Sequence, residues 1–440
     1  MPYVSPGYTF FWAAAFKQVL EVAMQSPKLG VHSSTDSPHP FIFLLLNLPF
    51  GITGGYITVV VPYLVTRAGL PVLTAASIVA IGLVPKAGKL FWAPLADVGL
   101  TLKKWYVIGA ATAGGMLLLQ GLLPLTHATV PLVTAALFAA ELGSSLLSPS
   151  LGGLMAEAMP DKLKGRAAGW YQLGGKVGGG AGGGIGLWLA VHTPTPAAPG
   201  LVLGLGCIGC IIGLRFLHEP ERRLSAKVLD RVKQIARELW QLVKSREGLL
   251  VAALAVSPIG ISGVDDFWSA VAREWGVSAG TIVLVTGFGR AAIAGAGCLL
   301  AGWWADRADR RVVYLATGGF VAAAGVTLGL TPHVPSVFVV GTLTQKFCIG
   351  MADAALSALI LSVIGRSAAA TKYTVLAALS NIGELYMTVT SGWIHDRWST
   401  EMMLIAESVS ALVCIVVATV VLKRFSETAQ SQKSQLVVGK

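Results

Sequence analysis

The 440-residue sequence is poor in charged residues: Asp, Glu, Lys and Arg make up 12% of it, about half the share of a typical soluble protein. Hydrophobic residues make up 54%. A chain of this composition has more apolar surface than folding in water can bury. The scarcity of charge therefore excludes an ordinary water-soluble globular protein, and we expect a lipid bilayer to be the solvent.

Cysteine is also scarce. The five cysteines, Cys207, Cys210, Cys298, Cys348 and Cys414, all fall in apolar stretches, which excludes a disulfide framework or a zinc site. The Cys207-Ile-Gly-Cys210 spacing resembles a redox motif, but two small thiols on one helix face are the favoured interpretation. We therefore expect neither a metal nor a cofactor.

Long apolar stretches recur along the chain, each of roughly the 20 residues that a bilayer-spanning helix needs. We predict twelve transmembrane helices, at 41–66, 71–94, 105–125, 130–151, 166–191 and 200–217 in the first half and at 248–272, 280–301, 312–331, 335–364, 371–394 and 401–422 in the second. Because the stretches are continuously apolar, whereas barrel strands alternate, the expected fold class is an all-α integral membrane protein. The expected parts are six-helix bundles at 41–217 and 248–422, a linker at 218–247, and end segments at 1–40 and 423–440.

The net charge of +11 at pH 7 does not indicate nucleic acid, because the cations lie in short connections between apolar stretches. Nine of them lie between Arg215 and Arg246, whereas only Arg67, Arg273 and Arg397 fall on the opposite side of the predicted spans. Positive charge marks the cytoplasmic side, so we expect both termini in the cytoplasm.

Two segments outside the spans have amphipathic patterns. In the linker, the spacing of Leu229, Val232, Ile235, Leu239 and Leu242 predicts a helix at the cytoplasmic face. Residues 8–25 contain several aromatic side chains and predict a helix lying on the membrane surface. Residues 1–39 lack the pattern of a cleavable signal peptide.

A short motif recurs in the two halves. Leu95-Ala96-Asp97 follows the second span, and Trp304-Ala305-Asp306-Arg307 follows the eighth, 209 residues later. Basic residues come next in each half, Lys103 and Lys104 in the first and Arg310 and Arg311 in the second. An acidic residue at a helix end, followed by cations, suits a charge-relay clasp that closes in one conformation and opens in another. A plain positive loop is the alternative interpretation.

The duplicated six-helix plan with a long central connection resembles the major facilitator superfamily, whose two halves rock about a site near the membrane midplane. Four elements are similar to the muropeptide permease branch of the peptide and acetyl-coenzyme A transporter family: Leu48-Pro49-Phe50-Gly51, Lys89-Leu90-Phe91-Trp92-Ala93-Pro94-Leu95-Ala96-Asp97, Gly165-Arg166, and Ala370-Thr371-Lys372-Tyr373-Thr374-Val375-Leu376-Ala377-Ala378-Leu379-Ser380. Siderophore importers of related architecture are similar in the same places. The resemblance implies a multi-pass protein of a bacterial inner membrane. The fifth span departs from the family, reading Leu173-Gly174-Gly175-Lys176 where a Gly-Tyr-Arg-like element is common.

Charges near the middle of a span are candidate functional residues, because each costs at least about 2.5 kcal/mol on insertion. The candidates are Glu141, Lys176, Asp265, Asp266, Arg290, Lys346, Asp353 and Glu384. Lys176 and Glu384 are 208 residues apart, and each follows a glycine, so they occupy nearly equivalent positions in the two halves. Interhelical ion pairs that only organise packing are the alternative.

We expect these residues to divide into two roles around a shared central cavity. Glu384 or Asp353 would exchange a coupling proton, with Glu141, Asp265 and Asp266 as further candidates, because a carboxylate in a partly dry cavity takes up a proton more readily. Lys176 and Arg290 would hold an anionic part of the substrate. Five aromatic side chains are candidates for stacking on a sugar or acyl group: Trp170, Tyr171, Trp268, Tyr373 and Tyr386. The alternative is that they only pack between helices or anchor them at the membrane interface.

Glycines are concentrated between Gly174 and Gly184. This run does not resemble a phosphate-binding loop, because no β-strand precedes it and no Lys-Ser or Lys-Thr pair follows it. Small residues at these spacings predict close packing of helices, and they also suit a sliding surface between the halves.

The sequence therefore predicts a secondary active transporter and not an enzyme: a permease that imports, by proton symport, an anionic sugar- or peptide-containing compound such as a muropeptide. A siderophore or other metabolite transporter of the same superfamily is the first alternative. The alternatives from another class are a membrane-embedded enzyme and a membrane sensor. An enzyme would show a reactive cluster at one membrane face, whereas His127, His192 and His333 lie in separate outer loops. A sensor would carry a sizeable soluble output domain, whereas the longest cytoplasmic connection here has about thirty residues. We expect a monomer whose partners are a small-molecule substrate, protons and the lipid bilayer.

Overall fold

The computed structural model describes residues 38–70, 72–89, 96, 100–195, 197–217, 219, 228–266, 268–278, 281, 285, 289–365 and 367–438, all within one unit, Pro38–Lys440. The helix expected at residues 8–25 and the motif residue Asp97 lie outside these ranges. Every regular element in the described ranges is helical, as the continuously apolar stretches predicted.

The helices of the first half follow the predicted spans closely. The first span is α2 (Ile42–Gly55), a π-helical turn (Tyr56–Val60) and α3 (Val61–Arg67), and the second is α4 (Val72–Ala87). The third to fifth are α6 (Leu102–Leu122), α7 (Val130–Ala158) and α8 (Lys164–His192), with a short 3₁₀ helix (Asp161–Leu163) before α8. The sixth is α9 (Ala198–Gly209) continued by a 3₁₀ helix, Cys210–Phe216.

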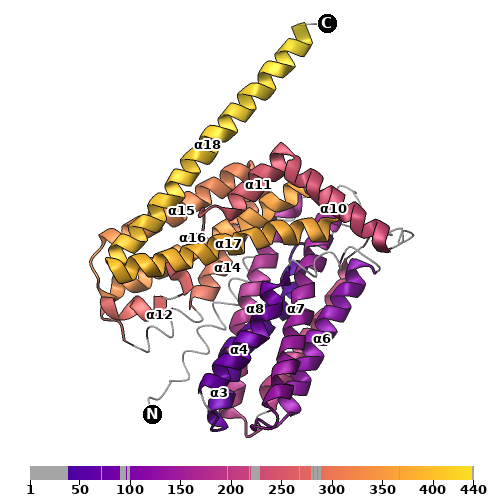
Figure 1. Ribbon diagram of the computed structural model, residues 1–440, viewed down its shortest axis with the longest axis vertical. Helices are drawn as coiled ribbons and strands as arrows, with labels where there is room; N and C mark the ends of the chain where they lie inside the picture. The colour runs from indigo at the N-terminus through magenta and orange to yellow at the C-terminus, as the bar shows by residue number, and fades with distance from the viewer. Residues whose placement is uncertain are drawn as a thin grey trace. The chain divides into compact units, whose positions relative to one another are not determined.

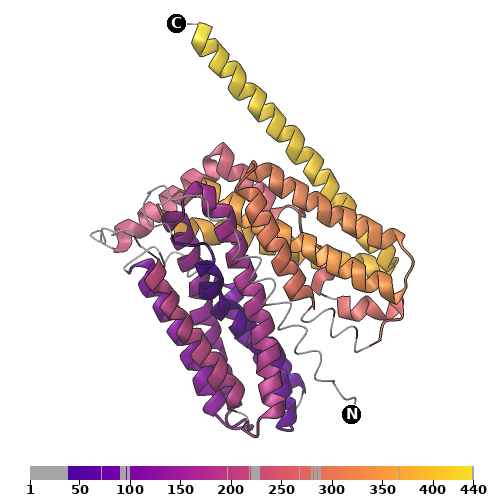
Figure 2. The same ribbon diagram turned by 180° about the vertical axis from the view of Figure 1, so that it is seen from behind.

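The second half begins after α10 (Val228–Lys244), the amphipathic helix expected in the linker. It contains α11 (Arg246–Val256), α14 (Arg290–Ala305), α15 (Arg310–Leu330), α16 (Pro335–Val363), α17 (Ala369–Arg397) and α18 (Thr400–Val438). Figures 1 and 2 both show the indigo-to-magenta helices of residues 42–216 gathered in one bundle and the orange helices, with the first part of α18, in another, while the yellow end of α18 projects away from both. The predicted division into two helical bundles is therefore confirmed.

The seventh span is not the continuous helix that the sequence predicted at 248–272. α11 ends at Val256, and helical structure resumes only in a 3₁₀ turn (Gly263–Asp266), α12 (Trp268–Val271) and a second 3₁₀ turn (Ala272–Trp275). Pro258 cannot donate a backbone hydrogen bond, and Gly260 has a φ of 75°, which helices do not use. These two residues break the helix at the depth of the central cavity.

Seven described helical segments are long and apolar enough to cross a membrane by length and composition alone. They are Ile42–Val65, Leu102–Leu122, Val130–Ala158, Ala198–Phe216, Arg310–Leu330, Pro335–Val363 and Thr400–Arg424. The helices α8 and α17 have the same 29-residue length as α7 and α16 but are more polar. They are also two of the helices that supply the charged side chains described below.

The two halves meet along a few helices. α8 packs against α14 and α16, and α17 packs against α7. Within the first half, α8 lies unusually close to α2: a Cβ at Gly178 would be 2.3 Å from the Leu48 carbonyl oxygen, and one at Gly51 would be 2.2 Å from that of Gly175. The prediction that the glycine run allows close helix packing is therefore confirmed.

A charged cavity between the halves as the candidate site

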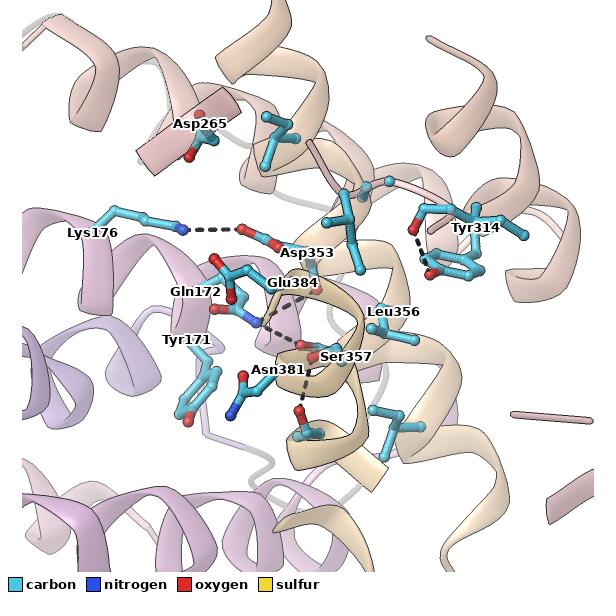
Figure 3. A pocket seen from close by; sticks show the side chains of 18 of the residues that line it. Tyr171, Gln172, Lys176, Asp265, Tyr314, Asp353, Leu356, Ser357, Asn381 and Glu384 are labelled. Atoms are coloured by element: carbon cyan, nitrogen blue, oxygen red, sulfur yellow. Dashed lines mark hydrogen bonds and ion pairs between the residues drawn. The ribbon is translucent and has the colours of Figure 1, made fainter. Parts of the chain in front are cut away.

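An ion pair joins the two halves in the middle of the molecule. The Lys176 Nζ of α8 lies 3.0 Å from the Asp353 Oδ2 of α16, and each side chain is about one-third exposed. Figure 3 shows the two groups pointing towards one another across the cavity. Each charge offsets the other's cost of leaving water, which is how an apolar span tolerates both.

Glu384 lies on the wall of the same cavity. It projects from α17 beside the ion pair (Figure 3) and lines both of two adjoining hollows, of about 230 and 700 Å³. Both hollows share Phe50, Tyr171, Gln172, Lys176, Asn381 and Glu384. The 208-residue offset thus brings Lys176 and Glu384 to one cavity, although the partner of Lys176 is Asp353.

A second charged cluster contains Asp265, Arg290 and Lys346. Asp265 Oδ1 pairs with Arg290, and its Oδ2 pairs with Lys346. Arg290 also donates to the Asp265 backbone carbonyl at 2.9 Å. Asp265 and Lys346 line the smaller hollow, whereas Arg290 is not among its lining residues and is buried behind them. In this cluster Lys346 and Asp265 therefore face the cavity, and the Arg290 guanidinium contacts Asp265 from the buried side.

Uncharged polar groups form a third layer, which the sequence analysis did not identify. Gln172 Nε2 donates to Ser357 Oγ at 2.7 Å across the halves, and the Tyr373 hydroxyl lies 3.4 Å from the same Ser357 Oγ. Tyr171 packs edge-on against Tyr373, with ring centres 6.1 Å apart. In Figure 3, Tyr171, Asn381 and Ser357 lie on the far side of the ion pair from Asp265. This group of lining residues is uncharged, and Lys89 is a further charged residue that lines the smaller hollow.

Several candidates from the sequence are placed away from the cavity. Trp170 packs edge-on against Phe41 at 5.1 Å, and the buried Trp268 packs against Trp275 and Phe338. Tyr386 donates to the Val256 carbonyl at 2.9 Å, at the end of α11. Glu141 is fully buried and lines neither hollow. The side chain of Asp266 lies outside the described part of the chain. Of the five aromatic candidates, Tyr171 and Tyr373 line the cavity.

One end of the bundle, which we call the basic face and define by Lys164, Arg166, Arg310, Arg311 and Lys372, is sealed between the halves. Asp306, at the end of α14, accepts hydrogen bonds from the backbone nitrogens of Gly165 and Arg166, at 2.7 and 3.0 Å, and from Arg166 Nε at 2.9 Å. A carboxylate at a helix N-terminus also interacts favourably with the helix dipole. Asp306 therefore holds the beginning of α8, in the other half.

Glycines let the backbones meet at this seal. A Cβ at Gly165 would lie 2.6 Å from the Gly302 carbonyl oxygen, and the reverse distance is the same. On the neighbouring pair of helices, Gly152 of α7 lies under the Tyr373 ring of α17. The Lys164 Nζ adds a 3.4 Å bond to the Leu361 carbonyl of α16. These contacts join the two halves at the basic face in the part of the chain that the structure describes.

The remaining basic candidates make separate contacts. Arg310 donates to the carbonyl of Asp161, joining the halves, and Arg311 pairs with Glu247 at 3.1 Å. Arg307 stacks on Trp303, with its guanidinium carbon 4.0 Å from the ring centre. In the first half, the backbone nitrogens of Leu102 and Lys103 donate to Glu219. The backbone nitrogen of Lys104 donates to the hydroxyl oxygen of Thr101.

The linker helix is tied to the start of α17. Glu238 of α10 pairs with Lys372 at 3.2 Å and accepts a 2.8 Å bond from Ser367. Burial raises the pKa of Glu238, but hydrogen bonds from Ser367, Lys372 and Gln234 outweigh it and hold the pKa below its ordinary value of 4.5. The carboxylate form is therefore favoured, which maintains the contact with Lys372 at neutral pH.

Two helical bundles around a charged cavity, with apolar helices long enough to span a bilayer, define a multi-pass membrane protein with a transporter fold. The family model described as Major Facilitator Superfamily matches residues 43–271 and, separately, 267–437. The chain belongs to the Major Facilitator Superfamily. A comparison with curated protein sequences gave no match.

Solved structures with low sequence identity share this fold. The proton:xylose symporter XylE is 13% identical, with a TM-score of 0.64 over 87% of this chain and 95% of the other. The E. coli fucose:proton symporter FucP is 14% identical, with a TM-score of 0.62 over 86% and 98%. The human organic anion transporter MFSD10 is 13% identical, with a TM-score of 0.62 over 86% and 98%. At these identities the likeness shows the fold, and the substrate has to be argued from the cavity.

Proposed function

We propose that the protein is a proton-coupled secondary transporter that imports an anionic compound with a sugar or peptide part, such as a muropeptide. The observation that carries the proposal is the Lys176–Asp353 ion pair, which joins the two halves inside a cavity that both halves line. In such a pair a substrate anion can replace Asp353 as the partner of Lys176, because the lysine then has a negative partner both before and after substrate binds. Two of the similar structures are proton symporters of sugars, and the third is an organic anion transporter.

The exchange couples the substrate to a proton. When a substrate anion takes the place of Asp353 beside Lys176, the released carboxylate is left in a partly dry cavity and favours its protonated form. Glu384, on the same wall, is the second candidate for this proton, and Asp265 the third. Since Lys176 and Asp353 belong to different halves, the exchange also removes a link between them.

The neutral layer supplies contacts for the rest of the substrate. Amide and hydroxyl groups of Gln172, Asn381 and Ser357 can donate to and accept from sugar hydroxyls or peptide groups. Tyr171 and Tyr373 supply ring surface beside them. A substrate with an anionic group and an uncharged polar part therefore matches the charged and uncharged groups of the cavity better than a simple ion does.

The basic face is proposed to be cytoplasmic, in keeping with the excess of positive charge in its loops. The larger hollow continues past Gly55, Thr58 and Gly179, along α2 and α8 away from the basic face. The structure then represents a state whose cytoplasmic side is closed by Asp306 and Arg166. Substrate would enter this state from the opposite side, and opening the Asp306–Arg166 contact would release it inside.

Flux into proteoliposomes tests the proposal. The panel contains labelled muropeptides and ferric siderophores, each with and without an imposed inward proton gradient. We expect muropeptide accumulation that needs the gradient and that Glu384→Gln or Asp353→Asn abolishes, while Glu401→Gln, at the exposed end of α18, retains it. Uptake that ignores the gradient would overturn the proton coupling. Uptake of siderophores alone would overturn the proposed substrate class.

A further inference from the structure

A residue outside the cavity makes hydrogen bonds to the non-helical break in the seventh span. Residues 257–262 are not helical, and the 3₁₀ turn Gly263–Asp266 that follows is a single turn. Its own hydrogen bonds are too few to fix its orientation, because most of a helix's rigidity comes from successive turns. Something else must therefore fix the direction of the side chains that this turn carries.

Glu407 of α18 makes the required contacts. Its Oε2 accepts a 2.8 Å bond from Ser262 Oγ, and its Oε1 accepts a 3.0 Å bond from the Val264 backbone nitrogen. Ser391 of α17 donates to the same Oε1. Glu407 is only 6% exposed, so it depends on such hydrogen bonds for the stabilisation that water would otherwise supply.

The contacts continue from Glu407 to the cavity helix α16. Gln345 Nε2 donates to Ser262 Oγ at 3.2 Å, and Gln345 Oε1 accepts from Trp268 Nε1 at 3.2 Å. Gln345 directly precedes Lys346, which pairs with Asp265. One network therefore joins Glu407, the break and the helix that carries both Lys346 and Asp353.

Asp265 directly follows Val264, whose amide Glu407 holds. We propose that Glu407 is a positioning residue: it fixes the broken part of the seventh span so that Asp265 faces Arg290 and Lys346 at the cavity wall. Glu407 itself lines neither hollow. Its effect passes through Ser262 and Val264 to Asp265.

Hydrogen exchange tests this inference without any substrate. In Glu407→Leu the Val264 amide loses its acceptor, so we expect exchange of the peptide containing residues 257–266 to be at least about tenfold faster, equivalent to about 1.4 kcal/mol. Glu407→Gln keeps an acceptor oxygen and should restore most of the protection. Glu401→Leu, the same change at the exposed beginning of α18, should leave it as in the unmodified protein. Unchanged exchange in Glu407→Leu would overturn the inference.

Ser262→Ala provides the second test if Glu407→Leu does not fold. It removes the hydroxyl that joins Glu407 to Gln345, and the same peptide should again exchange faster while the rest of α18 does not. Equal acceleration throughout the second half would point to general destabilisation and would overturn the positioning role.

The effect on transport rests on the proposed function. If Glu407 acts through Asp265, the uptake rate of the double variant Glu407→Leu/Asp265→Asn should be within about twofold of the rate of Asp265→Asn alone. The reason is that both changes remove the same contact of Asp265 with Arg290 and Lys346. Independent, multiplying losses would overturn the connection between the two residues. If the unmodified protein takes up nothing from the panel, the proposed function fails, and the exchange experiment still decides the role of Glu407.

Discussion

Tyr106 and Tyr314 make the same contact in the two halves. The Tyr106 hydroxyl donates to the Leu46 carbonyl at 2.8 Å, and the Tyr314 hydroxyl donates to the Leu254 carbonyl at 3.2 Å. Both donors and both acceptors are 208 residues apart. The third span is thus tied to the first as the ninth is tied to the seventh, which gives the internal repeat a physical basis beyond sequence spacing.

Removing the two hydroxyls should have unequal effects. The single hydroxyl hydrogen of Tyr314 is shared with the Ile259 carbonyl, which lies closer, at 2.8 Å, within the break of the seventh span, where no helical amide satisfies that oxygen. We expect Tyr314→Phe to lower the free energy of unfolding by about 1–2 kcal/mol and Tyr106→Phe by about 1 kcal/mol or less. Denaturation of both variants in the same detergent checks the order, and the reverse order would contradict it.

The seal at the basic face should not tolerate a side chain at Gly302. An added Cβ would lie 2.6 Å from the Gly165 carbonyl oxygen, so Gly302→Ala must separate α14 from α8. We expect a lower melting temperature and faster alkylation of a cysteine placed at Ser357 from the basic side. Gly319→Ala is the control, because nothing lies within 4 Å of its added carbon and alanine favours a helix. Equal behaviour of the two variants would contradict the close approach.

Asp306→Asn should loosen the same seal by a different route. The asparagine has one acceptor oxygen for the three donors that Asp306 satisfies, and its amide group would face the Gly165 or Arg166 nitrogen. Burial raises the pKa of Asp306 against the lowering effect of Arg166, so the carboxylate already bears a desolvation cost. We therefore expect a modest loss of about 1 kcal/mol, seen as faster hydrogen exchange at residues 164–170. Asp396→Asn, whose exposed side chain lies near the opposite end of α17 from Lys372, should leave that exchange unchanged.

The contact between α10 and α17 should depend on pH. The pKa of Glu238 is lower in the folded protein than its ordinary 4.5, so its contribution is complete above about pH 4.5 and is lost as the pH falls below that value. We expect Glu238→Gln to have a lower melting temperature than the unmodified protein at pH 7, with the difference vanishing towards pH 3. Lys372→Gln should behave in the same way. A difference that stays constant over this range would show that Glu238 acts through packing alone.

The sequence predicted the positions of the spans because a bilayer demands continuous apolar stretches, and the helix ends lie within a few residues of the prediction for α6 and α16. It did not predict the broken seventh span, although Pro258 and Gly260 were visible signals, because apolar residues continue on both sides. Glycine also had to be read in context: the run in α8 was assigned correctly to packing, since no nucleotide motif surrounded it.

The sequence could not predict which residue pairs with Lys176. Equivalent positions in two repeats approach the same axis, which placed Glu384 in the cavity, but whether Lys176 meets Glu384 or Asp353 depends on the rotation of α16 and α17. The neutral layer was missed because serines and amides are common in membrane helices. Its signal was the repeat itself, since Ser148 and Ser357, like Gln172 and Asn381, are 209 residues apart and line one cavity.

Lys176 and Asp353 should depend on each other in a double-mutant cycle. Lys176→Gln and Asp353→Asn each leave the other charge without its ion-pair partner, whereas the double variant removes both charges. We expect each single change to lower the free energy of unfolding and the double change to cost less than their sum, with a coupling of about 1 kcal/mol, because both groups are one-third exposed and partly screened. Lys176→Gln combined with Asp161→Asn, a pair without contact, should be additive. Additivity for Lys176 and Asp353 as well would mean that the ion pair does not hold the halves together, and the exchange of Asp353 for a substrate anion would then lose its basis.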